Sequence, residues 1–335
     1  MKGQHESMRS GLGRGAVEAA KTHNIRVYVS DLGNSMSLAD FAAQYPRRIV
    51  DAGIAEQDSV TMAAGAAHRT GERVYYATFE GFSKLAAEPF EQIVRRAKLN
   101  VCKVGSHVGL QVGQDGVSNQ VLNYLSYNKA ISDTVLCPAD WVEAKQMTVK
   151  LANVKDPKYA GPATMSMTRA EVLTLHDDNW EWSIGKGEVL RDGDDVAIMS
   201  YGALIEPSLG AAALLEGSGV SAAVINISSI KPIDSLLIEQ YARKTGLVVT
   251  AEDHSIDGGL GSSVSDVLSE RYPTHMRRIG AEKGETGSPK DLYRKAGFTP
   301  DAIAERVAGW VEIRHKDTTN GNGFEPRKIA PLVHD

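Results

Sequence analysis

Short apolar runs with the length of β-strands alternate with longer amphipathic or apolar stretches along the first half of the chain. Strands that alternate with helical patterns are typical of βαβ units, so this order predicts an α/β fold with a largely parallel sheet. The predicted strands cover residues 26–31, 73–79, 100–106, 133–140 and 163–168. The predicted helices between them cover 56–70, 84–98, 119–130 and 140–154.

The alternation stops at LHDDNWEWSIGKGEVLRDGDD (175–195), which is polar, rich in turn residues and without helical periodicity. A second α/β set follows. Its predicted strands are 195–202, 221–228 and 246–253, and its predicted helices are 204–217 and 233–244. We therefore expect two α/β domains, 1–174 and 195–314, joined by a linker at 175–194. The polar tail 315–335 is expected to be disordered or to lie over a partner.

One predicted helix begins on a carboxylate. In DAGIAEQDSVTMAAGAA (51–67), Val60, Ala63, Ala64 and Ala67 fall at i, i+3, i+4 and i+7 and share one apolar face. Glu56 lies at the start of this helix. One interpretation is that its charge complements the helix dipole. The other is a functional carboxylate, and the local pattern does not distinguish the two.

Composition and charge narrow the class of protein. The 335 residues are 42% hydrophobic and carry a net charge of −5, which gives no basic footprint for nucleic acid or anionic membrane. The first fifteen residues lack the apolar core of a signal peptide, and no run is long enough for a membrane helix. Cys102 and Cys137 are interpreted as reduced core residues of a cytoplasmic protein, and His23 and His68 as surface residues at helix ends.

A glycine cluster in the second half has two interpretations. GGLGSSVSDVLSERY (258–272) opens a predicted helix and superficially resembles a dinucleotide-binding loop. It lacks the acidic residue that such loops place about 20 residues further on, after a strand. We therefore expect these glycines to permit a tight turn and close helix packing.

Several motifs in order along the chain carry a family resemblance. They are DAGIAEQDSVTMAAGAA, ATFEGF, GSHVGLQVGQDGVSNQ, VLCPAD, SSIKPID, AEDHSIDGGLGSSVSDVLSERY and RIGAEKGETGSPKDLYRKAGFT. Together they resemble the C-terminal half of transketolase and, more closely, the separate small subunit of split, two-gene transketolases. The resemblance runs from about residue 10 to residue 312. It implies a pyrimidine-binding domain followed by a transketolase C-terminal domain, both α/β with parallel or mixed sheets.

The resemblance assigns the cofactor-binding residues. Glu56 matches the glutamate that hydrogen-bonds the aminopyrimidine of thiamine diphosphate and shares a proton with it, which requires a carboxylate in a dry, apolar site. Phe79 and Phe82 match aromatic residues that pack around the pyrimidine ring. Leu85 stands where the family usually has tyrosine, so it keeps an apolar contact and lacks the hydroxyl.

The same resemblance makes SHVGLQVGQDGVSNQ the substrate loop. His107 matches a histidine that helps to hold the sugar phosphate, and Asp115 matches an acid that contacts a substrate hydroxyl. Asn119 stands where transketolases usually carry a histidine that assists at the donor's first hydroxyl. An asparagine donates a hydrogen bond but does not shuttle protons near neutral pH, so the standard donor is in question.

Further residues are implied in binding the substrate's anionic end. Arg169 matches the family's phosphate-clamping arginine, whose planar fork suits a phosphate or a sulfonate. Ser35 in DLGNSM and Arg9 near the N-terminus are further candidates for the same site. The resemblance places the catalytic groups in the first domain, whereas the second domain mainly supports assembly.

The family's diphosphate motif, Gly-Asp-Gly followed by Asn, is missing from the sequence. The resemblance then implies that a partner subunit binds the diphosphate with its Mg²⁺ or Ca²⁺ ion, that this chain binds no metal, and that the two subunits assemble as α2β2. The implied reaction is transfer of a two-carbon ketol unit from a ketose to an aldehyde. The alternatives are the beta subunit of a 2-oxoacid dehydrogenase-type component, another acyl- or ketol-transfer enzyme, and a catalytically inactive binding partner, against which Glu56 argues.

Overall fold

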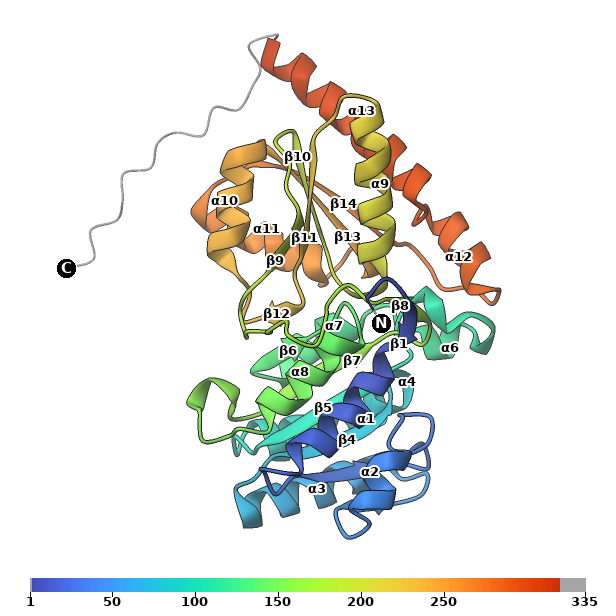
Figure 1. The fold of residues 1–335 in the computed structure, drawn as a ribbon, viewed down its shortest axis with the longest axis vertical. Helices are drawn as coiled ribbons and strands as arrows, with labels where there is room; N and C mark the ends of the chain where they lie inside the picture. Colours follow the sequence, from blue (N-terminus) through green and yellow to red (C-terminus); the bar gives the residue numbers. More distant parts are fainter. Residues whose placement is uncertain (1, 320–335) are drawn as a thin grey trace, which may run out of the picture.

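A computed structural model describes residues 2–319 as two α/β domains stacked end to end (Figure 1). The predicted fold class is confirmed. Within this described part of the chain, no helix combines the length and the apolar character needed to cross a bilayer. Cys102 and Cys137 are both buried free thiols, as the sequence predicts.

The first domain is built on a seven-stranded sheet in the order β12-β6-β7-β5-β4-β2-β3. All neighbouring pairs are parallel except β12 with β6. The sheet therefore has one long edge at which most carboxyl ends of the strands meet. Its strands are β12 (Ser229–Lys231), β6 (Thr134–Leu136), β7 (Ala163–Met167), β5 (Val101–Ser106), β4 (Val74–Phe79), β2 (Arg26–Val29) and β3 (Ile49–Asp51).

Helices cover both faces of this sheet. Helices α1 (Met8–Ala19), α2 (Ala39–Gln44) and α8 (Trp141–Leu151) bury their apolar sides in one core, and α3 (Glu56–Thr70) packs in the core on the other face. Val60, Ala63, Ala64 and Ala67 of α3 are all buried, so the predicted apolar face is confirmed.

Three predicted elements of this domain differ in extent. The helix predicted over 84–98 is divided into η1 (Lys84–Ala86), α5 (Ala87–Pro89) and a π-helical turn (Phe90–Arg95), after a short α4 (Glu80–Ser83). The helix predicted over 119–130 is broken between α6 (Val117–Gln120) and α7 (Tyr124–Ile131), because Val121 takes a left-handed conformation with φ 44°. The strand predicted over 133–140 ends at Leu136.

The second domain has a five-stranded sheet in the order β14-β13-β10-β11-β9. Helices α10 (Ser235–Thr245) and α11 (Leu260–Arg271) cover one face, and α9 (Ile205–Gly217), α12 (Pro289–Ala296) and α13 (Pro300–Thr319) cover the other. The strands are β9 (Glu188–Arg191), β10 (Val196–Ser200), β11 (Ala222–Asn226), β13 (Leu247–Ser255) and β14 (His275–Ala281).

The glycine cluster opens α11 as a close-packed turn. Glu252 accepts hydrogen bonds from the backbone N–H groups of Leu260 (2.6 Å) and Gly261 (2.9 Å). A Cβ on Gly259 would lie 1.9 Å from the Glu252 carboxylate. The turn therefore needs glycine at this position, because the buried Glu252 carboxylate approaches the backbone closely. This agrees with the expectation that the glycines permit a tight turn and close helix packing.

Regular structure extends into segments predicted to be linker and tail. Strand β9 lies within 175–194 and pairs antiparallel with β11. Helix α13 continues to Thr319, beyond the predicted start of the tail, and residues 320–335 lie outside the described residues. A short ribbon that the sequence pattern does not predict joins β1 (His5–Ser7) to β8 (Glu171–Leu173).

The two domains are interlocked. Strand β12 comes from the second half of the chain but pairs with β6 of the first domain (Figure 1). Buried side chains around Tyr124 and Cys137 of the first domain form one core with those around Tyr201 of the second. The hydroxyls of Tyr124 and Tyr201 lie 2.8 Å apart. The second domain is therefore fixed against the carboxyl-end edge of the first sheet.

A buried histidine connects the linker to both domains. His176 hydrogen-bonds Asp140 at the start of α8 (2.9 Å) and Glu188 of β9 (2.7 Å), and it stacks on Trp180. Burial opposes its charge, but the two carboxylates outweigh burial and raise the pKa of His176 to about 10. Nearby, burial raises the pKa of Glu143 to about 7, and this carboxyl accepts hydrogen bonds from Asn226 and Ser228 of the second domain.

We predict that His176→Gln lowers the free energy of unfolding by about 3 kcal/mol at pH 7, because it leaves a buried carboxylate without its cation. The folded-state pKa of His176 is above the unfolded value of about 6.5. Its stabilisation is therefore full below that value and is lost as the pH rises through about 10. The difference between wild type and variant, measured by urea unfolding, should shrink between pH 7 and pH 10.

His68→Gln is the control, since His68 is exposed at the end of α3 while His23 is half-buried. A His176→Gln effect that is constant with pH would show that the ring is neutral in the folded protein.

Candidate active site

The predicted site residues gather at the carboxyl-end edge of the first sheet. Phe79 ends β4, His107 follows β5 and Arg169 follows β7 by two residues, so three parallel strands deliver side chains to one edge. Ligands of open α/β sheets bind at this edge because the loops there diverge. Two groups of residues form along it, one around Glu56 and one around His107.

Glu56 is the first residue of α3 and its side chain is largely buried, with 7% of its surface exposed. Among residues 2–319, no side chain or backbone group donates a hydrogen bond to its carboxylate. Ile54 and Leu85, which are 82% and 60% exposed, line the same open depression. Gln57 donates a hydrogen bond to the backbone oxygen of Leu85 (3.1 Å) and so fixes η1 beside the start of α3.

Position 56 is set by local packing. The hydroxyls of Ser59 in α3 and Ser30 after β2 lie 2.8 Å apart in the interior, which ties the first turn of α3 to the sheet. The carboxylate is thus held at a helix N-terminus, with apolar side chains on one side and solvent on the other. Such a group can hydrogen-bond a ligand that enters the depression.

An aromatic stack links the end of β4 to the loop after β5, which is the loop predicted to bind the substrate. Phe79 lies between two rings: its centroid is 5.7 Å from that of Phe82 and 3.6 Å from that of His107, with nearly parallel planes. Phe82 is 38% exposed, so one side of the stack remains accessible.

The cluster around His107 is cationic. Arg9 of α1 donates hydrogen bonds to the backbone oxygens of Ser35 (2.9 Å) and Arg169 (3.2 Å). Arg169 in turn donates to the backbone oxygen of Val112 (2.8 Å). Ser35, Arg9, His107 and Arg169 are therefore brought together from four separate segments, and Arg9 belongs to the same cluster as Arg169.

His107 is neutral in this cluster. Burial, followed by the positive charges of Arg9 and Arg169, lowers the pKa of His107 to about 3. Its Nδ1 lies 2.9 Å from the Ser106 hydroxyl, and its backbone has a left-handed φ of 62°, a strained conformation for a non-glycine residue. At neutral pH the ring can donate one hydrogen bond to an anion, while the two arginines supply the charge.

The remaining loop residues lie beside this cluster. Asp115 ends the 3₁₀ segment η3 (Leu110–Asp115), and its carboxylate is 3.3 Å from the Arg169 guanidinium. The Asn119 amide nitrogen donates to the backbone oxygen of Asp115 (3.0 Å). Its amide oxygen lies near Gly81, between Phe79 and Phe82 in the sequence. Asn119 is therefore positioned between the cationic cluster and the aromatic residues.

The second domain holds this loop, which the sequence analysis did not foresee. Asp253 of β13 accepts hydrogen bonds from the backbone N–H groups of Leu110 (2.8 Å) and Gln111 (3.4 Å) and from the Tyr293 hydroxyl (2.9 Å). The Gln120 amide exchanges two hydrogen bonds with the backbone of Glu285. The contacts between the loop and the second domain connect residues more than 140 positions apart, so no local sequence signal reveals them.

A buried ion pair beneath the aromatic residues was also missed. Lys103 of β5 lies 2.6 Å from Glu80, and the same carboxylate accepts hydrogen bonds from Tyr127 and Asn128. A Cβ on Gly105 would lie 1.5 Å from Glu80, so glycine is required there. The sequence did contain a sign of this ion pair, because Lys103 lies within the apolar strand NVCKVGS and a buried cation needs a carboxylate partner.

Comparisons with known proteins place this arrangement in a family. The profile described as "Transketolase, pyrimidine binding domain" matches residues 8–172, and "Transketolase, C-terminal domain" matches residues 185–303. A "Putative transketolase C-terminal section" of Methanocaldococcus jannaschii is 34% identical over 313 residues, covering 92% of this chain and 97% of that protein.

Two further similarities concern separate subunits. A "6-deoxy-6-sulfo-D-fructose transketolase subunit" of a Clostridium strain is 32% identical over 289 residues, covering 85% of this chain and 88% of that protein. A solved structure described as "Split gene transketolase, inactive beta4 tetramer" superposes with a TM-score of 0.83 at 32% identity, covering 91% of this chain and 98% of that one.

Proposed function

The chain belongs to the transketolase family, and on that basis we propose that it is the small subunit of a two-component transketolase. The complex would transfer a two-carbon ketol unit from an anionic ketose to an aldehyde. One observation carries the proposal: Glu56 is a buried carboxylate without a partner among the described residues, and it borders a depression that its own chain leaves open.

The residues around Glu56 fit the pyrimidine half of thiamine diphosphate. An aminopyrimidine offers a ring nitrogen to a carboxylate and a flat face to apolar side chains. Glu56 would hold and share the proton at that nitrogen, and Phe79, Phe82 and Leu85 would supply the apolar contacts. When bound, the cofactor supplies a nucleophilic carbon. A second chain that covers Ile54 and Leu85 would exclude water and strengthen the hydrogen bond of Glu56.

The cationic cluster would bind the anionic end of the sugar. Arg9 and Arg169 supply the charge, neutral His107 and Ser35 supply further hydrogen bonds, and Asp115 would accept from a sugar hydroxyl. Both a phosphate and a sulfonate suit guanidinium groups. The Clostridium relative is described as acting on a sulfonated ketose, so a sulfonate is a substrate group to test beside phosphate.

The open depression favours a partner that carries the diphosphate and metal site. Exposed apolar side chains at its rim are typical of surfaces that associate. A related split-gene subunit is described as an inactive tetramer, so we expect this chain to self-associate and remain inactive when alone. With its partner it would form α2β2, a closed symmetric assembly.

Reconstitution tests the function. The chain alone should neither bind thiamine diphosphate tightly nor turn over, whereas co-expression with an N-terminal-half transketolase subunit should give a mass near the heterotetramer by light scattering.

The complex should transfer ketol units from ketose phosphates or sulfonates and should not oxidise pyruvate with lipoamide. Pyruvate oxidation without ketol transfer would identify a 2-oxoacid dehydrogenase component. A chain that stays monomeric and does not bind the partner subunit would refute the proposed assembly.

We predict that Glu56→Gln slows deuterium exchange at the cofactor's thiazolium C2 by about 100-fold or more, because the amide cannot share a proton with the pyrimidine. Exchange would be followed by NMR in the reconstituted complex. Asp40→Asn is the control, since Asp40 is also acidic and in the first turn of a helix, α2. If Glu56→Gln exchanged at the wild-type rate, Glu56 would act only as a charge that complements the helix dipole of α3.

We predict that Asn119→His shifts donor preference toward ordinary ketose phosphates or lowers activity on the native donor. The substitution exchanges a hydrogen-bond donor for a group that titrates near neutral pH. One altered hydrogen bond in the transition state corresponds to about 1–3 kcal/mol, or roughly 5- to 150-fold in kcat/KM. C2 exchange should stay near wild type. If the ratios of kcat/KM between different donors were the same in Asn119→His as in wild type, Asn119 would not contact the donor.

A further inference from the structure

A buried ion pair joins α4 to the sheet beneath the aromatic residues. Glu80 is fully buried and Lys103 is 1% exposed, and their charged groups lie 2.6 Å apart. The same carboxylate accepts hydrogen bonds from Tyr127 and from Asn128 (3.2 Å), both on α7. Because the pair does not reach solvent, neither group can contact a substrate or a cofactor. Any role of the pair in the site is therefore exerted through α4.

Lys103 contacts both ends of α4. Its ammonium group lies against Glu80, the first residue of the helix, and donates a hydrogen bond to the hydroxyl of Ser83, the last residue (3.0 Å). A helix of four residues makes few hydrogen bonds of its own, so the groups that it contacts set its orientation. The position of α4 on β5 therefore depends on these two contacts.

The contribution of this pair is geometric. Replacing a buried ion pair by apolar side chains of similar volume often leaves stability unchanged or raises it. The Glu80 carboxylate accepts from β5 on one side and from Tyr127 and Asn128 of α7 on the other, so these donors together restrict its orientation. Burial lowers the pKa of Lys103, and the charge of Glu80 opposes this shift, so each group needs the other.

Two features of the candidate site are attached to α4. Phe79 directly precedes the helix and stacks on His107, with 3.6 Å between the ring centroids. Gly81, the second residue of the helix, lies against Asn119: a Cβ on Gly81 would be 3.5 Å from the Asn119 Cα and 3.6 Å from its amide oxygen. A displacement of α4 would therefore move both the aromatic stack and the backbone that borders Asn119.

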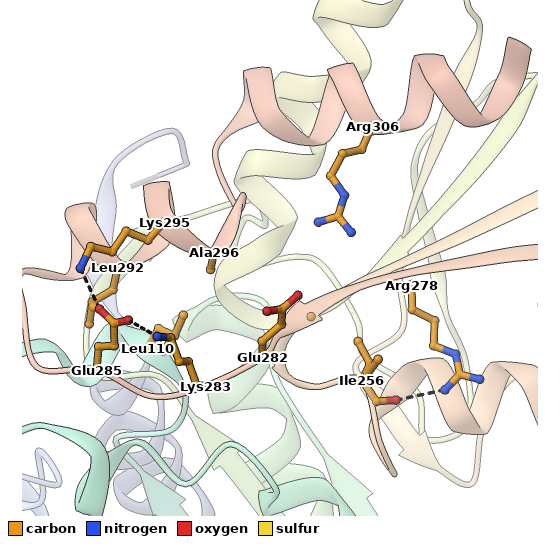
Figure 2. A pocket seen from close by; sticks show the side chains of 11 residues that line it. Leu110, Ile256, Arg278, Glu282, Lys283, Glu285, Leu292, Lys295, Ala296 and Arg306 are labelled. Carbon is orange, nitrogen blue, oxygen red and sulfur yellow. Dashed lines mark hydrogen bonds and ion pairs between the residues drawn. The ribbon is translucent and has the colours of Figure 1, made fainter.

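The residue after Asn119 is held from the other side by the second domain. Gln120 exchanges hydrogen bonds with the backbone of Glu285. Figure 2 shows the Glu285 carboxylate between Lys283 and Lys295, with which it pairs at 3.0 Å and 2.7 Å. The second domain thus fixes the end of the loop, while α4 borders Asn119 from the first domain.

From these contacts we infer that the Lys103–Glu80 pair is a positioning unit for the donor end of the proposed active site. It holds α4 in one orientation, which keeps the aromatic stack in place at the end of β4. The same orientation sets the space beside Asn119 in which the donor ketose would lie. The statement about the donor rests on the proposed function, whereas the statement about the stack does not.

Histidine NMR on the full chain alone tests whether the pair holds the stack. A ring that lies over an aromatic face is shielded by its ring current, so the carbon-bound ring protons of His107 should resonate upfield of those of exposed His68. His107→Gln assigns these resonances, because it removes them. In the double variant K103M/E80Q, which leaves no buried charge, they should move toward the His68 positions because α4 is released.

Glu143→Gln is the matched control. Glu143 is also a buried carboxyl with a hydrogen-bond donor on another element, but that donor is Ser228 of the second domain. Its substitution should leave the His107 resonances at their wild-type positions. If K103M/E80Q unfolds, Glu80→Asp decides, because it keeps both charges and shortens the side chain, and it should shift the resonances in the same direction. Unchanged His107 resonances in the variants that fold would overturn the inference.

The reconstituted complex tests the donor end. K103M/E80Q should lower kcat/KM for the ketose donor by about tenfold or more, because a small misplacement of contact groups costs rate steeply. C2 exchange at saturating thiamine diphosphate should stay near wild type, since Glu56 lies on α3, which the Ser59–Ser30 contact holds. Equal losses in both measurements would overturn a role confined to the donor end. Absence of ketol transfer in the wild-type complex would refute the proposed function, while the NMR result would still decide the role of the pair in the stack.

Discussion

The Asp253 carboxylate accepts hydrogen bonds from backbone N–H groups of the loop after β5, which have no partner within the loop itself. After β5 the chain passes through positive φ angles at His107, Gly109 and Gly113, which leaves N–H groups of a buried loop without helical or strand partners. Buried N–H groups need acceptors. The Asp253 carboxylate supplies them, and a Cβ on Gly109 would lie only 2.3 Å from it. The loop after β5, and hence the position of His107, depends on a carboxylate from the other domain.

The same dependence explains why the domains interlock. A loop held across an interface stays in place only if the interface is rigid. Strand β12 extends the first sheet with residues from the second half of the chain, and the His176 ion pairs fix the linker between Asp140 and Glu188. The cationic cluster of Arg9 and Arg169 is thereby built on a firm edge. Burial, followed by the charges of Arg9 and Arg169, lowers the pKa of His107 to about 3, so the cluster holds its charge pattern across physiological pH.

The two ends of the candidate site differ in how they are completed. At the His107 end, the second domain of the same chain packs on the loop after β5. At the Glu56 end it leaves a buried carboxylate beside exposed Ile54 and Leu85. A carboxylate that must share a proton needs a dry environment. The chain provides half of that environment, which accords with the proposal that a second polypeptide contributes the rest.

The sequence by itself determined the elements and the motifs that are local. Short apolar runs predicted strands β2, β4, β5, β6, β7, β10, β11 and β13, and a period-3.6 pattern predicted the apolar face of α3. The family motifs pointed to Glu56, Phe79, His107 and Arg169 as a group. Tertiary structure alone decided which distant groups meet. The Asp253–Leu110 and Lys103–Glu80 contacts and the pairing of strands β9 and β12 join segments that are far apart in the chain or lie outside regular periodicity. Periodicity reports which face of an element is buried, whereas a side-chain pairing depends on register and on how two faces pack.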